Sequence, residues 1–408
     1  MHAVGIIVEY NPFHNGHFYH VQQSKKKTEA DCVVAVMSGH FLQRGEPALV
    51  SKWTRTRMAL AGGADLVIEL PFTFAVQQAD LFASGAMSIL AALNVESFCF
   101  GSENGDIEAF LQTESFYRTH EEQVSSHVRQ ALKDGMSYPK AMALALKTVG
   151  ESKQLLDLSQ PNNILGYAYI KAIIQHHYAI RPYTITRIDS HYHDETLSSS
   201  TVTSATSIRK ALFSQKANLQ MINRYIPEST EKYLQDYALT YGLYHEWEHY
   251  FPYLKYTLLS MTPEQLQDIY GIEEGIEHRL LHYIKQSRTF SEFMQLIKNK
   301  RYTWTRLQRM CVHILTHTTK AQMEVALKQQ TAAYIRLLGM SKNGQAYLKE
   351  QKKNLCLPLV STLSKFQHSQ LEQDIKATNV YSFALNEPAR SDFLFQEYRT
   401  PPIIFDQI

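Results

Sequence analysis

Two histidines stand three residues apart near the start of the chain, in the order His14, Asn15, Gly16 and His17. Imidazole groups donate hydrogen bonds, which stabilise the charge that gathers on a phosphate when its phosphorus is attacked. Gly16 leaves room for a ligand at the backbone, and a helix that starts here presents unpaired N–H groups to a phosphate. The spacing H-x-G-H after a strand therefore predicts a site that holds an α-phosphate while pyrophosphate leaves it.

The two histidines allow two other interpretations. They could be ordinary loop and helix-cap residues, or their spacing could place both rings on one side of a helical turn as metal ligands. No carboxylate or third histidine lies at ligand spacing, which argues against the metal. His20 would extend the series, but its position is more typical of a helix surface. The location of the motif at the first strand-to-helix junction favours the phosphate interpretation.

A second stretch, residues 203–210, combines hydroxyl groups and cations at the predicted start of a helix. A helix N-terminus with the Ser207 hydroxyl and the cations Arg209 and Lys210 would suit the outer phosphates of a nucleotide. The alternative is an ordinary N-cap followed by a basic surface face. The presence of the first motif favours phosphate binding.

The elements that must position these motifs alternate between strand and helix patterns in the first third of the chain. Apolar runs typical of buried strands cover residues 3–9, 32–37, 65–70 and 97–101, and helical patterns cover residues 17–27, 51–61 and 79–93. This order predicts a parallel sheet with helices on both faces and a ligand site beyond the carboxyl ends of its strands. A fifth strand is predicted over residues 183–188, after a mostly helical stretch, and a polar loop over residues 189–203.

The 408 residues are too many for one typical domain. We predict an α/β fold: a Rossmann-like parallel-sheet nucleotidyltransferase domain over residues 1–225, followed by a mainly helical C-terminal region over residues 226–408. The order of elements after about residue 320 is not predicted. A hydrophobic content of 44% excludes a disordered chain, and a net charge of +2 neither demands nor excludes a nucleic-acid partner.

Cysteines and apolar runs bear on the compartment. The four cysteines form no C-x-x-C pair, which indicates neither a zinc site nor a redox motif. No apolar run approaches the ~20 residues that span a bilayer, and the N-terminus has no basic leader. We therefore expect a cytoplasmic protein that does not bind a membrane.

Residues 298–309 contain five cations and no acid, with Tyr302 and Trp304 among them. Cations with interleaved aromatic rings suit an RNA backbone with unstacked bases. The alternative is a solvated helix surface, and composition alone favours neither. The cations are Lys298, Lys300, Arg301, Arg306 and Arg309.

Several motifs together resemble the bacterial tRNA(Met) cytidine acetate ligase family, within the H-x-G-H nucleotidyltransferase superfamily. The similar stretches are GIIVEYNPFHNGH at residues 5–17, MSGHFLQRGEPA at 37–48, GGADLVIELP at 62–71, FGSE at 100–103, PNNILG at 161–166 and KRYTWTRL at 300–307. They are spread over most of the chain. One departure is that Ser204, Ala205 and Thr206 replace the Ser-Ser/Thr core of the superfamily's second signature, which leaves Ser207 and Arg209 in place.

The resemblance implies an activity. Such enzymes activate acetate with ATP to acetyl-adenylate and then acetylate N4 of the wobble cytidine of elongator tRNA(Met). His14 and His17 would be catalytic, and Mg²⁺ is expected with the phosphates. The implied ATP contacts are Ile7, Val8, Glu9, Tyr10, Asn11, Pro12, Phe13, His14, Asn15, Gly16, His17, Phe18, Tyr19, His20, Gly101, Asn162 and Arg187.

The resemblance also favours tRNA contact for the basic stretch. Reversing the charge of Arg306 and Arg309 is therefore expected to weaken tRNA binding and to spare acetate activation. Two competing functions use the same motifs: an adenylyltransferase that moves AMP onto a small phosphorylated metabolite, and a tRNA-binding protein whose nucleotide site is only structural. The acetate ligands and the oligomeric state are not predicted.

Overall fold

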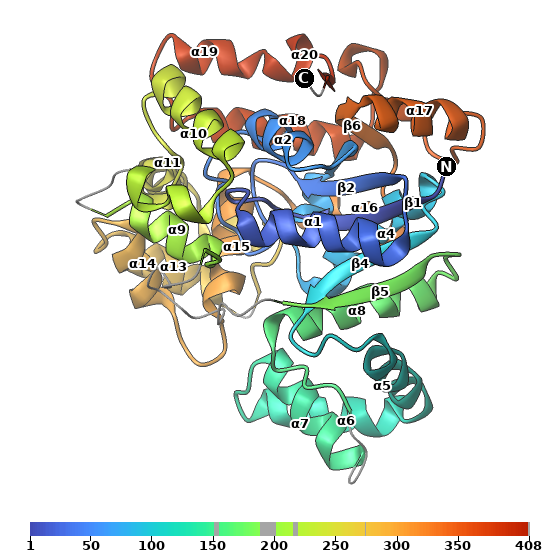
Figure 1. Ribbon diagram of the computed structural model, residues 1–408. Helices are drawn as coiled ribbons and strands as arrows, with labels where there is room; N and C mark the ends of the chain where they lie inside the picture. Colours follow the sequence, from blue (N-terminus) through green and yellow to red (C-terminus); the bar gives the residue numbers. More distant parts are fainter. Residues whose placement is uncertain (151–154, 188–200, 215–218, 274, 407–408) are drawn as a thin grey trace.

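The computed structural model describes residues 1–150, 155–187, 201–214, 219–273 and 275–406 (Figure 1). Five parallel strands form the first part of an eight-stranded sheet in the order β5-β4-β1-β2-β3-β6-β7, with β8 paired to β6. Their apolar sequences suit burial on both faces, as in β2, where all seven residues are buried. The five strands are β1 (Ala3–Val8), β2 (Cys32–Ser38), β3 (Leu66–Leu70), β4 (Ser97–Ser102) and β5 (Arg181–Thr186).

The strand order reverses between β1 and β4. The chain runs outward from β1 through β2 to β3, then returns to place β4 on the other side of β1. Open α/β sheets bind ligands at this kind of switch, beyond the carboxyl ends of the strands. The predicted parallel sheet is confirmed, with small shifts: the first helix begins two residues earlier than expected, and β5 ends at Thr186. Ile188, at the end of the predicted fifth strand, and most of the predicted polar loop lie outside the described residues.

Helices cover both faces of the sheet. Alternate residues of β2 divide between the two cores: Val33 and Ala35 pack with side chains of α1 and α2, whereas Val34 and Val36 pack with α4 and α8. This division is what the period of two in a strand requires when both faces are covered. The helices are α1 (Asn15–Thr28), α2 (Lys52–Ala61), α3 (Phe72–Ala75), α4 (Ala79–Ala92) and α8 (Pro161–Gln175).

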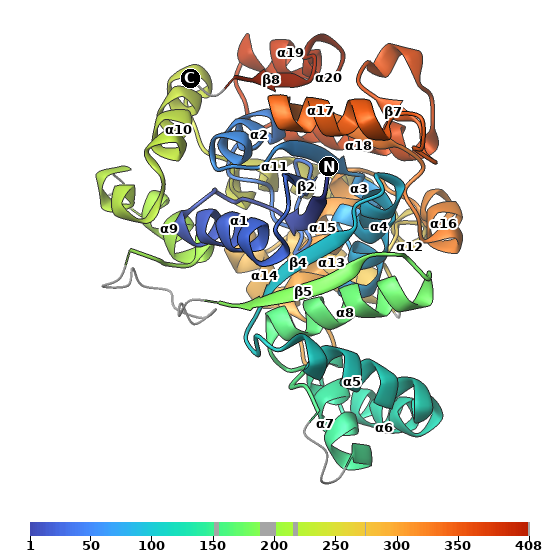
Figure 2. The ribbon, with the colours of Figure 1, turned by 45° about the vertical axis from the view of Figure 1, so that its right-hand side comes forward.

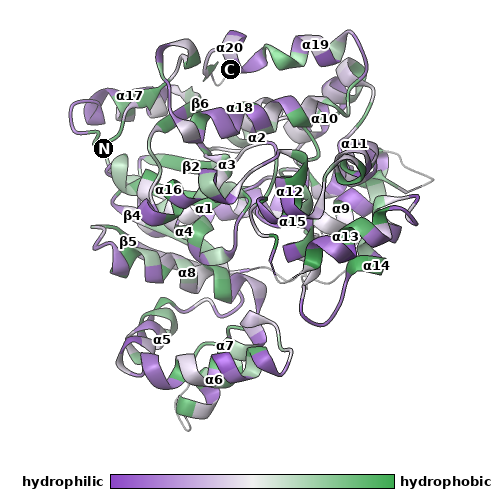
Figure 3. Cartoon of the chain, turned by 180° about the vertical axis from the view of Figure 1, so that it is seen from behind, coloured by the Kyte–Doolittle hydropathy of each residue, from purple (hydrophilic) through white to green (hydrophobic). Residues whose placement is uncertain are grey.

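Three helices between β4 and α8 form an arm that projects from the sheet: α5 (Ile107–Thr119), α6 (Glu121–Lys133) and α7 (Tyr138–Gly150) (Figures 1 and 2). In Figure 3 the arm stands apart as a cluster with mixed polar and apolar residues. Leu132, Met136 and Tyr138 at its α6–α7 turn are each 42% exposed. The arm packs on the rest of the molecule mainly where α5 lies against α8.

A helical region follows β5. Apolar side chains between residues 247 and 315 share one core, whereas Ile208, Leu212, Leu234 and Tyr237 pack in the core that contains α1 and α2. No helix of the described residues is long and apolar enough to cross a membrane. The helices are α9 (Ala205–Leu212), α10 (Glu228–Tyr241), α11 (Trp247–Ser260), α12 (Pro263–Gln267), α13 (Ile276–Ile284), α14 (Phe290–Ile297), α15 (Trp304–Leu315) and α16 (Lys320–Gln329).

The end of the chain returns to the first sheet. β6 (Ile335–Ser341) pairs antiparallel with β3, and β7 (Leu359–Val360) and β8 (Ile403–Phe405) pair with β6. Between them lie α17 (Lys342–Gln351), α18 (Ser369–Ser382), α19 (Ala389–Leu394) and α20 (Gln396–Arg399). Strands from both sides of residue 225 thus share one sheet, and the predicted division at residues 225 and 226 remains a proposal about function.

Buried charged side chains hold this return in place. The Lys52 Nζ donates to both carboxylate oxygens of Glu69 at 2.8 Å, and it also pairs with Glu397 of α20. The Arg336 Nη2 lies 3.6 Å from the Glu397 Oε2. Removing one partner from such a cluster leaves an uncompensated buried charge and costs about 3–5 kcal/mol.

Candidate nucleotide site

A cavity of about 1040 Å³ opens beyond the carboxyl ends of β1 and β4, at the switch in strand order. Its walls include β1 and the loop after it, the ends of β4 and β5, and the N-terminal parts of α8, α9 and α15. The loops after β2 and β3, the α6–α7 turn of the arm and residues 270–273 also line it. The cavity therefore brings together parts of the chain that are more than two hundred residues apart. Both predicted phosphate motifs and part of the basic stretch face it.

His14 and His17 are fixed at the start of α1 by a reciprocal cap. The Gly16 N–H donates to the His14 Nδ1 at 3.0 Å, and the His14 N–H donates to the His17 Nδ1 at 3.3 Å. The two rings stack with their centroids 3.7 Å apart. Because each Nδ1 accepts a backbone N–H, the proton of each neutral ring resides on Nε2.

Tyr10 supports these rings from behind. Its backbone adopts a left-handed φ of 51°, which a residue with a Cβ rarely takes and which occurs often at functional sites. Its ring packs edge-on against Phe13 and His17, with centroids 4.7 and 4.9 Å away. The turn at Asn11 and Pro12 follows directly, so the strand, the turn and the helix cap form one continuous unit.

The histidines are neutral at physiological pH. Burial and, to a lesser extent, the nearby cations Arg187 and Arg209 together lower the pKa of His14 to about 3. Burial, together with His14, Arg187 and His20, also holds the pKa of His17 well below its usual value. Neutral rings with a proton on Nε2 can donate hydrogen bonds to phosphate oxygens, and their protonation state does not change near neutral pH.

His20 also faces the cavity, which corrects the expectation of a helix-surface residue. Burial and Arg187 lower the pKa of His20 to about 4. Its Nε2 is buried and has no hydrogen-bond partner among the described residues. One further turn of α1 therefore adds a third imidazole to the same wall.

The second motif lies against the first. The Arg209 Nη1 donates to the Asn11 carbonyl at 2.9 Å, and its Nη2 donates to the Glu46 Oε2 at 2.7 Å. Ser204, the N-cap of α9, accepts the Ser207 N–H. Because Ser207 is buried against that cap, it does not line the cavity, and neither does the exposed Lys210. Of the three residues predicted here, only Arg209 reaches the site, and Thr206 supplies a hydroxyl that the sequence did not single out.

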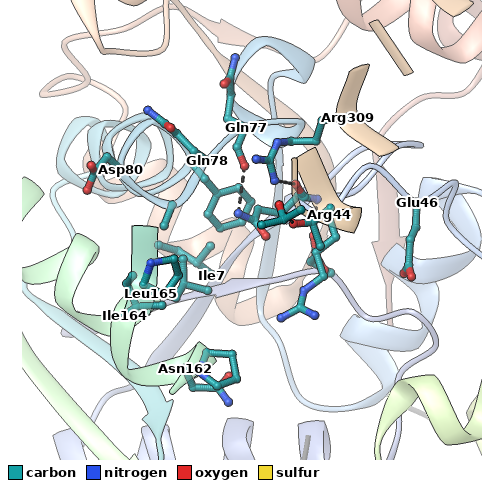
Figure 4. Close-up of a pocket in the computed structure, with 18 of the residues that line it drawn as sticks. Ile7, Arg44, Glu46, Gln77, Gln78, Asp80, Asn162, Ile164, Leu165 and Arg309 are labelled. Atoms are coloured by element: carbon teal, nitrogen blue, oxygen red, sulfur yellow. Dashed lines mark hydrogen bonds between the residues drawn. The ribbon is translucent and has the colours of Figure 1, made fainter. Parts of the chain in front are cut away.

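Gly101, Asn162 and Arg187 all line the cavity. A Cβ on Gly101 would lie 3.3 Å from the Arg187 Cγ, so the absence of a side chain lets these two residues approach closely. Asn162 stands at the start of α8, where Glu103 accepts both its backbone N–H at 3.1 Å and its side-chain amide at 2.6 Å. Figure 4 shows Asn162 below Leu165 and Ile164 at one end of the cavity. These residues form a partly apolar end, suited to an adenosine.

Some predicted ATP contacts shape the loop rather than the cavity wall. Pro12, Phe13, Asn15 and Phe18 are not part of the lining. Phe13 is buried against Gly62, where a Cβ would lie 2.2 Å from the Phe13 ring. The Asn15 side-chain amide donates to the carbonyls of Thr201 and Arg224, both at 2.9 Å. The residues that do line the cavity are Ile7, Val8, Glu9, Tyr10, Asn11, His14, Gly16, His17, Tyr19 and His20.

The basic stretch divides into two groups. Arg301, Arg306 and Arg309 line the same cavity as the histidines, whereas Lys298 and Lys300 do not. Arg306 pairs with Glu273 at 3.0 Å, and its guanidinium lies 4.6 Å from the Tyr302 ring centroid. The sequence predicted tRNA contact for this stretch, and the structure makes part of it one wall of the nucleotide cavity.

Sequence reasoning missed the loops after β2 and β3. Gln43 lines the cavity, and its N–H donates to the Glu9 Oε1 at 2.7 Å, while its side-chain amide donates to the Gln77 carbonyl at 2.9 Å. Burial raises the pKa of Glu9. Arg44 also lines this region. Residues 37–48 carry a signal for these contacts, because loops at the carboxyl edge of a parallel sheet carry ligand contacts.

The described residues contain no group of three or more His, Cys, Asp or Glu side chains that could hold a metal ion. Four acidic residues of the described chain line the cavity: Glu46 is paired with Arg209, Glu273 with Arg306 and Asp80 with Lys171, and Glu9 accepts the Gln43 N–H. The imidazoles, arginines and helix N-termini that line the cavity suit the binding and polarisation of phosphates.

Comparisons with known proteins agree with this geometry. A family model described as HIGH nucleotidyl transferase matches residues 1–394. The chain is similar to a tRNA(Met) cytidine acetate ligase from Geobacillus sp. (strain WCH70), with 54% identity over 405 residues, which covers 99% of this chain and 100% of the relative. A protein of the same name from Bacillus subtilis (strain 168) is 52% identical over 409 residues, covering 100% of this chain and 98% of the relative.

Two solved structures of Thermotoga maritima TmcAL have the same fold. The apo form I superimposes with a TM-score of 0.92 at 30% identity, covering 100% of both chains. A form II structure bound with alpha-thio ATP superimposes with a TM-score of 0.90, again at 30% identity and full coverage.

Proposed function

Since the chain belongs to the HIGH nucleotidyl transferase family, we propose that it is an ATP-dependent tRNA cytidine acetate ligase. It activates acetate as acetyl-adenylate and acetylates N4 of the wobble cytidine of elongator tRNA(Met), releasing AMP and pyrophosphate. The names of relatives over 50% identical along the whole chain support the acceptor. The observation that carries the proposal is one cavity lined by both phosphate motifs and by three arginines of the basic stretch.

ATP binds with its adenosine toward Gly101 and Asn162 and its α-phosphate at the start of α1. A carboxylate oxygen of acetate attacks the α-phosphorus, the new C–O–P link forms, and the bond from phosphorus to the pyrophosphate oxygen breaks. The Nε2–H groups of His14 and His17 donate to the α-phosphate oxygens as their charge grows. Arg209 and the N-terminus of α9 hold the leaving pyrophosphate.

The acetyl group then moves to RNA. The N4 amine of the cytidine attacks the acetyl carbon, the carbon–oxygen bond to AMP breaks, and the amine loses a proton. A wobble base in an anticodon loop is single-stranded, so unstacking it is inexpensive. Arg301 and Arg306, at the cavity wall, are placed to bind the loop's phosphates.

Mg²⁺ accompanies the triphosphate in this proposal. The ion typically binds through phosphate oxygens and water with one or two carboxylates, rather than in a cage of protein ligands. That habit fits a cavity whose described residues form no three-residue metal cluster but include the carboxylate of Glu46 beside Arg209. When bound, Mg²⁺ neutralises charge on the outer phosphates.

The remaining parts of the proposal concern where the protein works and how it is divided. ATP and tRNA are cytoplasmic substrates, so we place the enzyme in the cytoplasm. Residues 1–225 would act as the ATP-binding catalytic part, and residues 226–408 would contribute most of the tRNA-binding surface. The position of α15 in the cavity wall means that the second part also completes the first.

Acetate-dependent exchange of labelled pyrophosphate into ATP, without tRNA, tests the proposal. We expect labelled pyrophosphate to enter ATP only while acetate is present. An adenylyltransferase would exchange pyrophosphate only with its own acceptor, and a purely structural nucleotide site would not exchange it at all. Absence of acetate-dependent exchange under conditions where ATP binds would refute the proposed function.

A further inference from the structure

Six arginines line the cavity, and they fall into groups with different neighbours: Arg44, Arg187, Arg209, Arg301, Arg306 and Arg309. Arg187 and Arg209 are the cations that lower the pKa of His14, so they lie beside the imidazoles. Arg301 and Arg306 precede or begin α15, and Arg306 is neutralised by Glu273. Arg44 and Arg309 lie together at a third place, on the same side of the cavity in Figure 4 and away from Asn162.

Arg309 is a half-buried cation without a carboxylate partner. Among the described residues its guanidinium makes one hydrogen bond, from Nη1 to the Gln43 carbonyl at 3.5 Å, and it forms no ion pair. Burial, with Arg306 and Arg44, lowers its pKa to about 10. A guanidinium kept out of water beside other cations is costly unless an anion joins it.

The residues around Arg309 leave its charge available. His313, one turn later on α15, has its pKa lowered to about 3 by burial and by Arg309, so it stays neutral. Tyr270 donates its hydroxyl to the Gln77 Oε1 at 3.3 Å, while the buried Gln77 Nε2 has no partner in the described part of the chain. This wall therefore contains an unneutralised cation and an unused amide donor, and no carboxylate of the described residues is paired with either.

The position of Arg309 suits the nucleophile rather than the leaving group. Gln43 connects it to the first motif, since its carbonyl accepts from Arg309 and its N–H donates to Glu9 at the end of β1. An in-line displacement places the attacking and leaving oxygens on opposite sides of phosphorus. Arg187 and Arg209 lie beside the histidines, where they face the phosphates. The attacking anion approaches from the opposite side of phosphorus and therefore requires a different cation.

We propose that Arg309 binds the carboxylate of the acyl substrate and holds it beside the α-phosphate. This inference rests on the proposed function and deepens it, because it separates Arg309 from the tRNA-binding cations with which the sequence grouped it. A guanidinium is suited to the task, since its planar fork matches a carboxylate with two hydrogen bonds.

The test uses the full-length enzyme and two substitutions, Arg309→Gln and Arg309→Lys. Three quantities are measured: the KM for acetate in pyrophosphate exchange, the Kd for ATP without acetate, and the Kd for elongator tRNA(Met). We expect Arg309→Gln to raise the acetate KM by about tenfold to a hundredfold, with the ATP and tRNA Kd values within about threefold of wild type. Arg309→Lys keeps the charge but not the fork, so its KM should lie between the two.

Arg288→Gln is the matched control, because it removes the same group from an exposed position outside the cavity. It should leave the acetate KM unchanged. An unchanged acetate KM in Arg309→Gln, or a loss of ATP or tRNA affinity in its place, would overturn the assignment. A wild-type enzyme that shows no acetate-dependent exchange would instead refute the proposed function. If Arg309→Gln does not fold, Arg309→Lys carries the same test through its KM.

Discussion

The loop at residues 10–17 and the basic stretch at residues 298–309 supply the same cavity but are built in different ways. In the loop, the cap bonds between His14 and His17 and the packing of Tyr10 are all made within a few residues. In the basic stretch, the role of each cation depends on whether tertiary packing turns it toward the cavity. Arg309 reaches inward, whereas Lys300 does not line the cavity. The role of a motif whose contacts are all local can be predicted from the sequence, whereas the role of a run of cations depends on tertiary packing.

The largest effect is expected from a substitution in the loop at residues 10–17. His17→Ala removes a neutral donor to the α-phosphate and should lower the rate of acetate-dependent exchange by about a hundredfold to a thousandfold. Affinity for tRNA should be unchanged, because the basic stretch is untouched. Lys26→Ala, an exposed position on the same helix, is the control and should exchange at the wild-type rate. Full-rate exchange by His17→Ala would show that the loop is not the centre of the chemistry.

The same loop should make stability depend on pH. The pKa of His14 is about 3 in the folded state, below its ordinary value of 6.5, so its neutral form stabilises the fold above pH 6.5. As pH falls below 6.5 the unfolded state takes up a proton that the folded state does not, and stability is lost. At pH 5 the loss from this one residue is about 2 kcal/mol.

Urea unfolding of wild type and His14→Asn at pH 7.5 and pH 5 measures this term, since asparagine can still cap α1 but does not titrate. The variant should lose about 2 kcal/mol less than wild type between the two pH values. Equal losses would mean that the ring is not held neutral by the fold.

The smallest effect is expected at the outer cations of the basic stretch. Arg301→Gln with Arg306→Gln should weaken tRNA binding by about tenfold at physiological salt and flatten its salt dependence. Acetate-dependent exchange should not change. This differs from the pairing of Arg306 with Arg309 that the sequence suggested. Lys285→Gln with Arg288→Gln removes the same charge from exposed positions outside the cavity and should leave tRNA affinity intact. Equal weakening by both pairs would indicate general electrostatics instead of a site.

Much of the sheet could be predicted from the sequence, because its strands are short apolar runs and the intervening helices have clear caps, such as Ser51 before α2. The first motif was predictable for the same reason: its bonds are local. The meeting of Arg209 with Asn11 could be inferred only from the resemblance, since 198 residues separate them.

The return of the chain to the sheet could not be predicted. The return depends on the buried ion pair between Lys52 and Glu397, which are 345 residues apart, and no local sequence pattern predicts such a pair. The inward position of Arg309 has the same origin. Its helix packs through Leu307 and Met310, and the register of that packing decides which arginine faces the cavity.

The most direct test of the joint site is mass analysis of the nucleosides of elongator tRNA(Met) after incubation with the protein, ATP and carbon-labelled acetate. If the loop at residues 10–17 and the basic stretch at residues 298–309 serve one reaction, wild type should place a labelled acetyl group on the wobble cytidine and His17→Ala should place none. If wild type leaves the cytidine unmodified under conditions where acetate-dependent exchange proceeds, the result would contradict the claim that the basic stretch binds tRNA next to the activated acetyl group.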